Sequence, residues 1–103
     1  MQTADLDIRH YDRIYFLGIG GIGMSALALY CLQAGKRVDG YDRTETDLCR
    51  RLAAAGAQIH YTESPECVPA DTQLVIYTPA IPADHREWPV VRALGVPVCK
   101  RAE

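Results

Sequence analysis

Short apolar runs alternate with amphipathic stretches along the whole chain. Five runs have the β-branched or apolar character of buried strands, at residues 14–17, 37–41, 58–61, 73–77 and 96–99. The stretches between them place apolar residues at helical spacing and predict helices at 22–33, 45–55 and 84–94. Strands and helices alternate and the links between them are short, which predicts parallel strands joined by right-handed crossovers.

Glycine and proline mark the ends of these elements. Gly35, Gly56 and Gly95 each follow a predicted helix and precede a strand, which is typical of a left-handed helix C-cap. Two prolines interrupt residues 78–82 and predict a loop, and Asp84 with Glu87 three residues later resembles a helix start. We therefore expect an α/β fold, a doubly wound Rossmann-like sheet of about five strands in the order 3-2-1-4-5. Residues 13–103 form this single domain, and residues 1–12 form a polar lead-in segment.

The first strand runs into a glycine-rich turn, and a helix follows at once. The turn has the spacing Gly18-x-Gly20-x-x-Gly23, the arrangement in which nucleotide-binding βαβ units place a phosphate at a helix N-terminus. Backbone N–H groups at that end have no helical partner and attract anions. A side chain at Gly20 is expected to block the approach of a phosphate, and the strand, the helix and a downstream acidic residue favour binding over a plain turn.

The predicted strand order places a second loop beside this turn. In a 3-2-1-4-5 sheet the order reverses between the first and fourth strands, and ligands bind beyond their carboxyl ends. The loop 78–82 follows the fourth strand there, and Asp42 ends the second strand 19 residues after Gly23. Two interpretations of Asp42 remain open: its carboxylate accepts ribose hydroxyls, or it caps the turn that follows. Arg43, Lys100 and Arg101 are the candidate cations for a phosphate.

Composition excludes several classes of protein. The chain has 103 residues, 49% of them hydrophobic, and a net charge of −2, which argues against nucleic acid or an anionic membrane as a partner. Four cysteines without a C-x-x-C pair indicate reduced thiols rather than a zinc site. We see no secretory signal or bilayer-spanning run, no P-loop, and no catalytic or metal-binding set, so we expect a cytoplasmic binding domain with no catalytic centre of its own.

The chain resembles the Mur ligases of bacterial peptidoglycan synthesis. The resemblance rests on the glycine-Met-Ser stretch 18–25, Tyr41-Asp42, the loop 78–81 and the closing Arg101-Ala-Glu103. It covers residues 13–103 and only the first of the family's three domains. It is strongest to the members that add L-alanine to UDP-N-acetylmuramate, with a murein tripeptide ligase as the alternative within the family.

The resemblance implies a substrate and a separate role for each of the three domains. The N-terminal domain of such a ligase holds the UDP part of UDP-N-acetylmuramate, while the central and C-terminal domains use ATP and Mg²⁺ to activate the muramate carboxylate. Neither ATP nor Mg²⁺ is then a cofactor of this chain. Carried over by position, the substrate-binding residues are Gly18, Ile19, Gly20, Gly21, Ile22, Gly23, Met24, Ser25, Asp42, Arg43, Thr78, Pro79, Ala80 and Ile81.

Two positions depart from the family pattern, and two other functions stay open. Glu63 stands where family members often have His, and Thr78-Pro79 stands where they often have two serines. The bare glycine spacing with Asp42 also fits an NAD-binding domain of an oxidoreductase. A stand-alone regulatory or interaction module is the third possibility.

Overall fold

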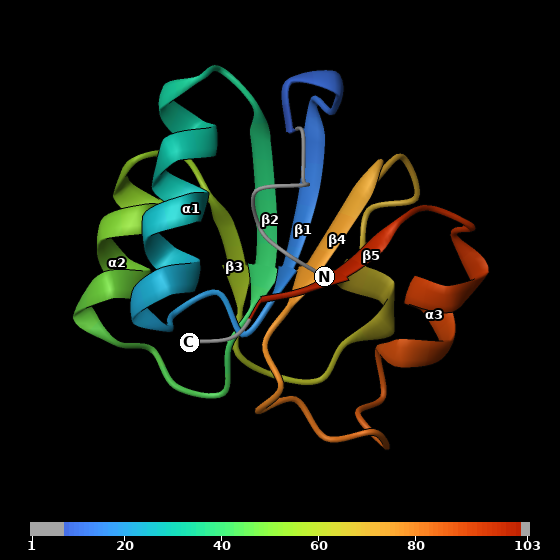
Figure 1. Cartoon of the computed structure of the whole chain (residues 1–103). Coiled ribbons are helices and arrows are strands. Elements are labelled where there is room, and N and C mark those ends of the chain that lie inside the picture. Colours follow the sequence, from blue (N-terminus) through green and yellow to red (C-terminus); the bar gives the residue numbers. More distant parts are fainter. Residues whose placement is uncertain (1–7, 102–103) are drawn as a thin grey trace.

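The expected strand order is confirmed. The structure, a computed structural model, describes residues 8–101 and contains one parallel five-stranded sheet in the order β3-β2-β1-β4-β5. From the N-terminus, the strands are β1 (Arg13–Leu17), β2 (Arg37–Tyr41), β3 (Gln58–His60), β4 (Leu74–Tyr77) and β5 (Val98–Lys100). All carboxyl ends lie at the same edge of the sheet, which is the lower edge in Figure 1.

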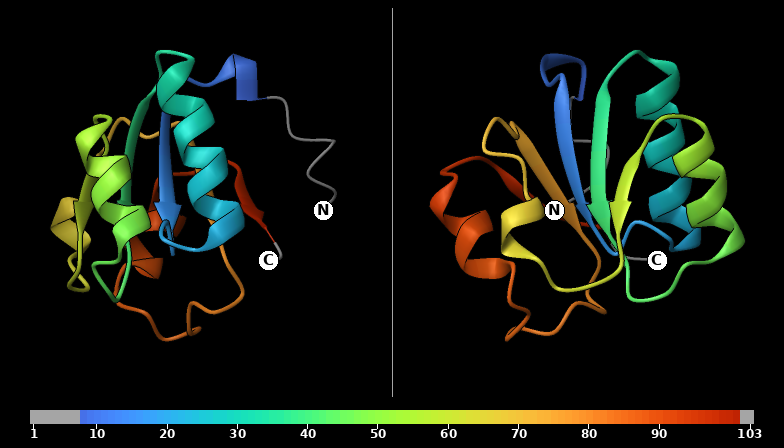
Figure 2. Two further views of the ribbon diagram at one scale, coloured as in Figure 1. Left: turned by 90° about the vertical axis from the view of Figure 1, so that its left-hand side faces the viewer. Right: turned by 180° about the vertical axis from the view of Figure 1, so that it is seen from behind.

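Helices cover both faces of the sheet. Helices α1 (Ile22–Gln33) and α2 (Asp47–Ala54) pack side by side on one face, and α3 (Trp88–Ala93) packs on the other (Figures 1 and 2). Two short 3-10 helices, η2 (Ile8–His10) and η3 (Pro65–Cys67), lie before β1 and between β3 and β4. This arrangement is the doubly wound architecture that the alternation of elements predicts.

The last helix begins four residues later than expected. Asp84 is exposed, and the chain turns at His85, whose N–H donates to Pro82 O, before α3 begins at Trp88. Pro89 occupies the first turn of α3, where a missing N–H removes no helical hydrogen bond. The predicted capping box is therefore wrong, because Glu87 is fully buried and turns into the protein.

Smaller boundary shifts have local causes. Helix α2 begins at Asp47 rather than residue 45 because Thr46 is its N-cap, with its Oγ1 accepting from the Cys49 N–H at 3.3 Å. Strand β5 begins at Val98 rather than residue 96, and its first link to β4 is the Pro97 carbonyl, which accepts from Val75 N–H. Pro97 has no N–H of its own to donate to the sheet.

The core lies on both sides of β1, the central strand. The apolar residues of β1 are at most 2% exposed, and along the strand they alternate between two core clusters. The larger cluster lies under α1 and α2 and contains Ile14 and Phe16, and the smaller lies toward α3 and contains Tyr15 and Leu17. A strand buried on both faces is apolar without alternation, which is why residues 14–17 read as a continuous run.

The segment expected to precede the domain is partly described. Ile8 packs into the larger core cluster, and the Asp12 N–H donates to Gln73 Oε1 at 2.6 Å. Residues 1–7 of that segment lie outside the described residues, as do Ala102 and Glu103. Among residues 8–101, no helix is long and apolar enough to cross a membrane.

Candidate functional site

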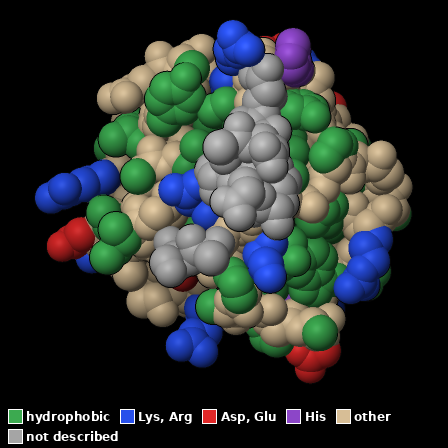
Figure 3. Space-filling view, in the orientation of Figure 1, with side chains coloured by type: hydrophobic (Ala, Val, Ile, Leu, Met, Phe, Trp, Pro, Cys, Tyr) green, Lys and Arg blue, Asp and Glu red, His purple; other side chains and the backbone are tan. Residues whose placement is uncertain are grey.

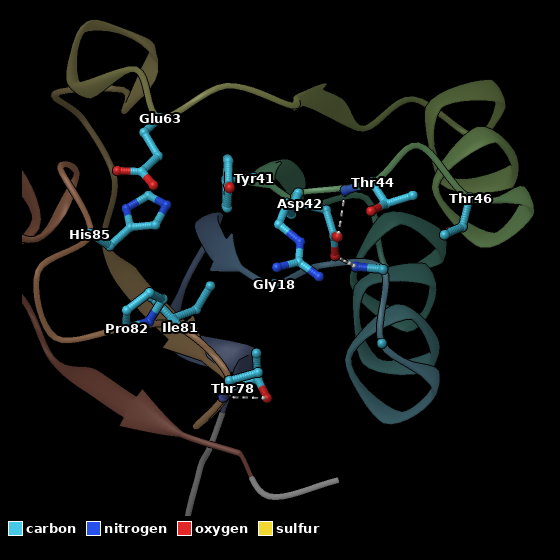
Figure 4. A pocket seen from close by; sticks show the side chains of 14 residues that line it. Gly18, Tyr41, Asp42, Thr44, Thr46, Glu63, Thr78, Ile81, Pro82 and His85 are labelled. Carbon is cyan, nitrogen blue, oxygen red and sulfur yellow. Dashed lines mark hydrogen bonds between the residues drawn. The ribbon is translucent and has the colours of Figure 1, made fainter.

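A cavity of about 710 Å³ opens at the carboxyl edge of the sheet, where the strand order reverses between β1 and β4. This volume lies within the usual range for a small-molecule site. Figure 4 shows the glycine turn after β1 and side chains that follow β2, β3 and β4 arranged around it. The lining residues are Gly18, Gly20, Gly21, Tyr41, Asp42, Arg43, Thr44, Thr46, Glu63, Thr78, Ala80, Ile81, Pro82 and His85.

The structure brings the three sequence-predicted segments together around this cavity. Gly18, Gly20 and Gly21 lie on one wall, Asp42 and Arg43 beside them, and Thr78, Ala80 and Ile81 opposite. The other six predicted residues do not line it. Ile19 and Met24 are buried in the core, Ile22 is 83% exposed, and Ser25 is buried with its Oγ donating to Ile22 O; the remaining two are Gly23 and Pro79.

The backbone amides of the glycine turn are engaged by the protein itself. Gly18 and Ile19 donate their N–H groups to the Tyr41 carbonyl at 2.8 and 3.0 Å, and the Gly20 N–H donates to Asp42 Oδ2 at 2.7 Å. The turn is thus tied to the end of β2 by three hydrogen bonds. An anion at this wall therefore needs hydrogen-bond donors other than these three amides.

Asp42 holds two turns at once. Its Oδ2 accepts from Gly20 N–H, and its Oδ1 accepts from Thr44 N–H at 3.2 Å, as drawn in Figure 4. The capping interpretation of Asp42 describes these contacts. Each carboxylate oxygen has a second lone-pair direction, so the same side chain still has capacity to accept a hydroxyl from a ligand.

Two glycines of the turn are required by close packing. A Cβ on Gly20 would lie 2.7 Å from Cys49 Sγ and 2.8 Å from Asp42 Oδ2. Gly18 has φ +89°, and a Cβ there would lie 2.3 Å from Thr78 Cγ2. A side chain at Gly20 therefore meets the protein's own side chains, in addition to any phosphate whose approach it is expected to block.

The wall opposite Asp42 and Thr44 carries side chains that the sequence motifs do not predict as part of the site. It is formed by Tyr41, Glu63, Pro82 and His85, from the end of β2, the loop after β3 and the loop before α3. His85 is 3% exposed and packs edge-on against Tyr41, with ring centroids 4.5 Å apart. Burial and the nearby charge of Glu63 raise the pKa of the Tyr41 phenol. The sequence marks two members of this wall, Tyr41 within the family resemblance and Glu63 as a departure from the family pattern.

A buried polar network lies behind that wall. Glu87 Oε1 accepts from the Tyr15 hydroxyl, while Oε2 accepts from His60 Nε2 at 2.7 Å and Ser64 N–H at 2.9 Å. Burial by itself raises the pKa of Glu87, but these hydrogen bonds outweigh it and hold the pKa below its ordinary value. Burial and Glu87 together raise the pKa of Tyr15. His60 is thus committed to this network.

Positive charge at the cavity is sparse. Arg43 is the one Lys or Arg among the lining residues, and it is exposed. Lys and Arg side chains are scattered over the face shown in Figure 3, with apolar side chains between them. Among residues 8–101, no cluster of three His, Cys, Asp or Glu side chains has the arrangement of a metal site.

Comparison with known proteins identifies the family. Residues 13–103 match the profile described as "Mur ligase family, catalytic domain", and the match starts where β1 starts. The chain belongs to the Mur ligase family. This Mur ligase domain is 46% identical to the UDP-N-acetylmuramate–L-alanine ligase of Phocaeicola vulgatus and 48% identical to that of Parabacteroides distasonis, over 95% and 94% of its length.

A solved structure agrees in fold and family. The UDP-N-acetylmuramate-alanine ligase from Thermotoga maritima superimposes with a TM-score of 0.80 and 39% identity, covering 86% of this chain and 20% of that chain. The chain spans 22% of the length of each of the two curated relatives. Both comparisons therefore match this Mur ligase domain to one part of a larger ligase.

Proposed function

We propose that the cavity binds the UDP portion of UDP-N-acetylmuramate, as the N-terminal domain of a UDP-N-acetylmuramate–L-alanine ligase. The observation that carries the proposal is the position of the cavity. It lies at the strand-order reversal between the glycine turn and the Thr78 loop, in a chain up to 48% identical to ligases of that name. Open α/β sheets bind nucleotides at this point.

Each group of lining residues matches one part of the nucleotide by its chemistry. Arg43 supplies the positive charge that a diphosphate requires at the mouth of the cavity. Asp42 offers carboxylate lone pairs to ribose hydroxyls beside the glycine turn, which it also anchors through Gly20. Thr78 and Ile81 form the facing wall.

The reaction itself is assigned to the full-length protein. We propose an ATP-dependent ligase that joins L-alanine to the muramate carboxylate in peptidoglycan synthesis in the cytoplasm. The 103 residues contain no P-loop, and the described residues offer no metal-binding cluster. The residues present thus do not fit ATP or Mg²⁺, and we assign both to the parts of the ligase outside this chain.

Calorimetry on the 103-residue chain tests the binding proposal. We expect heat of binding with UDP-N-acetylmuramate and none with NADH; binding of NADH in its place overturns the proposal. Arg43→Gln is expected to weaken binding and to reduce its dependence on salt concentration, because one contact to the diphosphate is lost. Arg50→Gln is the matched control, since it removes the same charge from an exposed position of α2.

A further inference from the structure

The polar side chains of the wall that faces Asp42 and Thr44 are Tyr41, Glu63 and His85, called here the polar wall. Two reciprocal carboxylate contacts hold this wall in place. Glu63 Oε1 accepts from Arg86 N–H at 2.9 Å, and Glu87 Oε2 accepts from Ser64 N–H at 2.9 Å. Each of two neighbouring loops therefore contributes a carboxylate that binds the backbone of the other. These contacts fix Glu63 and His85 in place at the end of the cavity before any ligand arrives.

The contacts of His85 leave one donor without a partner. Its Nδ1 accepts from Glu87 N–H at 3.1 Å, so the ring proton is on Nε2 in this arrangement. His85 Nε2 is buried and has no hydrogen-bond partner among the described residues. Leaving a buried N–H unpaired is unfavourable, and a native structure that tolerates one normally has a use for it.

Glu63 supplies the opposite kind of group beside it. Arg86 N–H occupies one side of Glu63 Oε1, and the remaining lone pairs of the carboxylate belong to a side chain that lines the cavity. In Figure 4 this carboxylate lies next to the imidazole of His85, whose far nitrogen points toward the cavity and Tyr41. An acceptor and a donor thus stand side by side at one end of the site.

This pair matches one chemical group of the proposed ligand. A cis-amide edge carries a C=O and an N–H next to each other, and the imide of uracil has this arrangement. The acetamido group of an amino sugar is trans, so its C=O and N–H point in opposite directions and cannot meet both partners together. A carboxylate is also a poor neighbour for the diphosphate, because like charges repel.

We propose that the polar wall recognises the uracil base of the nucleotide. Glu63 accepts the N3–H of the ring, and His85 Nε2 donates to an adjacent carbonyl oxygen that enters between Glu63 and Tyr41. This inference rests on the proposed function and adds the base-reading residues to it. It assigns to Glu63 and His85 a role in specificity rather than in the chemical step.

Methylation of the base separates this inference from the binding proposal. Calorimetry on the unsubstituted chain compares UDP, N3-methyl-UDP and ribose 5-diphosphate. We expect N3-methyl-UDP to bind at least tenfold more weakly than UDP, because a methyl group replaces the hydrogen bond to a charged acceptor. Equal affinities for UDP and N3-methyl-UDP overturn the inference and leave the proposed function standing, whereas absence of UDP binding overturns both.

Two substitutions of His85 form a matched pair. His85→Asn keeps an acceptor near Glu87 N–H but has no atom at the Nε2 position. The longer side chain of His85→Gln keeps an N–H donor at the Nε2 position. We expect His85→Asn to weaken UDP binding about three- to tenfold, which corresponds to the loss of one hydrogen bond. We expect His85→Gln to retain more of the affinity for UDP. Ribose 5-diphosphate affinity is expected to stay unchanged in both.

Glu63→Ala completes the test. We expect it to lose the discrimination between UDP and N3-methyl-UDP while it still binds ribose 5-diphosphate as before. Loss of ribose 5-diphosphate affinity in step with UDP, in this variant or in His85→Asn, contradicts base recognition and indicates a general disturbance of the cavity. Urea unfolding of each variant checks that the domain is folded, and the N3-methyl comparison needs no variant at all.

Discussion

Gly18→Ala combines a backbone strain with a side-chain clash, and the structure allows the two to be measured separately. Gly18 has φ +89°, a conformation that costs about 1–2 kcal/mol for a residue with a Cβ. The new Cβ would also lie 2.3 Å from Thr78 Cγ2, and such overpacking costs about 1–3 kcal/mol. We expect Gly18→Ala to lower the free energy of unfolding by about 2–5 kcal/mol in total.

Gly35→Ala is the control for strain alone. Gly35 has φ +83°, nearly the same as Gly18, but nothing lies within 4 Å of the Cβ position. Both substitutions remove the same glycine flexibility from the unfolded chain, so that contribution cancels between them. The difference between the two variants is therefore the cost of the clash with Thr78.

Thr78→Ser provides the second check, because it removes Cγ2 and keeps the hydroxyl. The next atoms around the new Cβ are Thr78 Cβ at 3.5 Å and Ile81 Cδ1 at 3.7 Å, which are ordinary contacts. Thr78→Ser alone is expected to cost about 0.8 kcal/mol, the value of one buried methyl group. Together with Gly18→Ala it is expected to recover about 1–3 kcal/mol relative to the sum of the single effects.

Urea unfolding of the four proteins in this cycle measures the coupling. Trp88 is the single tryptophan of the chain and is 8% exposed, so its fluorescence reports loss of the fold. The denaturant slope is compared across the series to confirm that the variants unfold over the same surface. Additivity within about 0.5 kcal/mol would refute the reasoning, as would equal costs for Gly18→Ala and Gly35→Ala.

Three further predictions concern the site and its support. The free energy of unfolding should fall as the pH drops from 4.5, the ordinary pKa of a glutamic acid, through the lowered pKa of Glu87. Glu87→Gln should flatten this part of the pH profile measured by urea unfolding, and an unchanged profile would exclude Glu87 as the source of the pH dependence. Asp42→Ala should cost about 1–3 kcal/mol in urea unfolding, because the N–H of Gly20 loses a charged acceptor, whereas no cost would mean that water replaces it. Gly40→Ala should cost at least about 2 kcal/mol, since its Cβ would lie 2.9 Å from the backbone oxygen of Phe16, and a native-like midpoint in urea would show that β1 and β2 can separate.

The sheet order follows from the sequence because each element carries its own signal. Residues 14–17 are buried on both faces and therefore uniformly apolar, and Gly35, Gly56 and Gly95 each have positive φ after a helix. The start of α3 has no such independent signal. Asp84 and Glu87 have the spacing of a capping box, but Glu87 satisfies Tyr15, a residue distant in sequence, and such a contact is invisible to local patterns.

The site divides in the same way. The glycine turn, Asp42 and the Thr78 loop are reached by motif and topology, because both depend on the order of elements along the chain. Glu63 and His85 come from two irregular loops, and what brings them together is a pair of carboxylate–backbone contacts. No spacing rule relates loops that are joined only by tertiary hydrogen bonds.

The two sides of the cavity are therefore constrained for different reasons. At the glycine wall, a side chain added at Gly18 or Gly20 meets the protein first, so substitutions at these two positions are expected to act on stability before they act on binding. At the polar wall, Glu63 and His85 are held by contacts from neighbouring residues, and their own polar atoms face the cavity region. The base-reading inference thus predicts that substitutions in the polar wall change which base is accepted, with little effect on the sheet. We therefore expect nucleotide preference in this domain to change with substitutions in the loops after β3 and before α3, and to stay unchanged with substitutions in the glycine turn that identifies the fold.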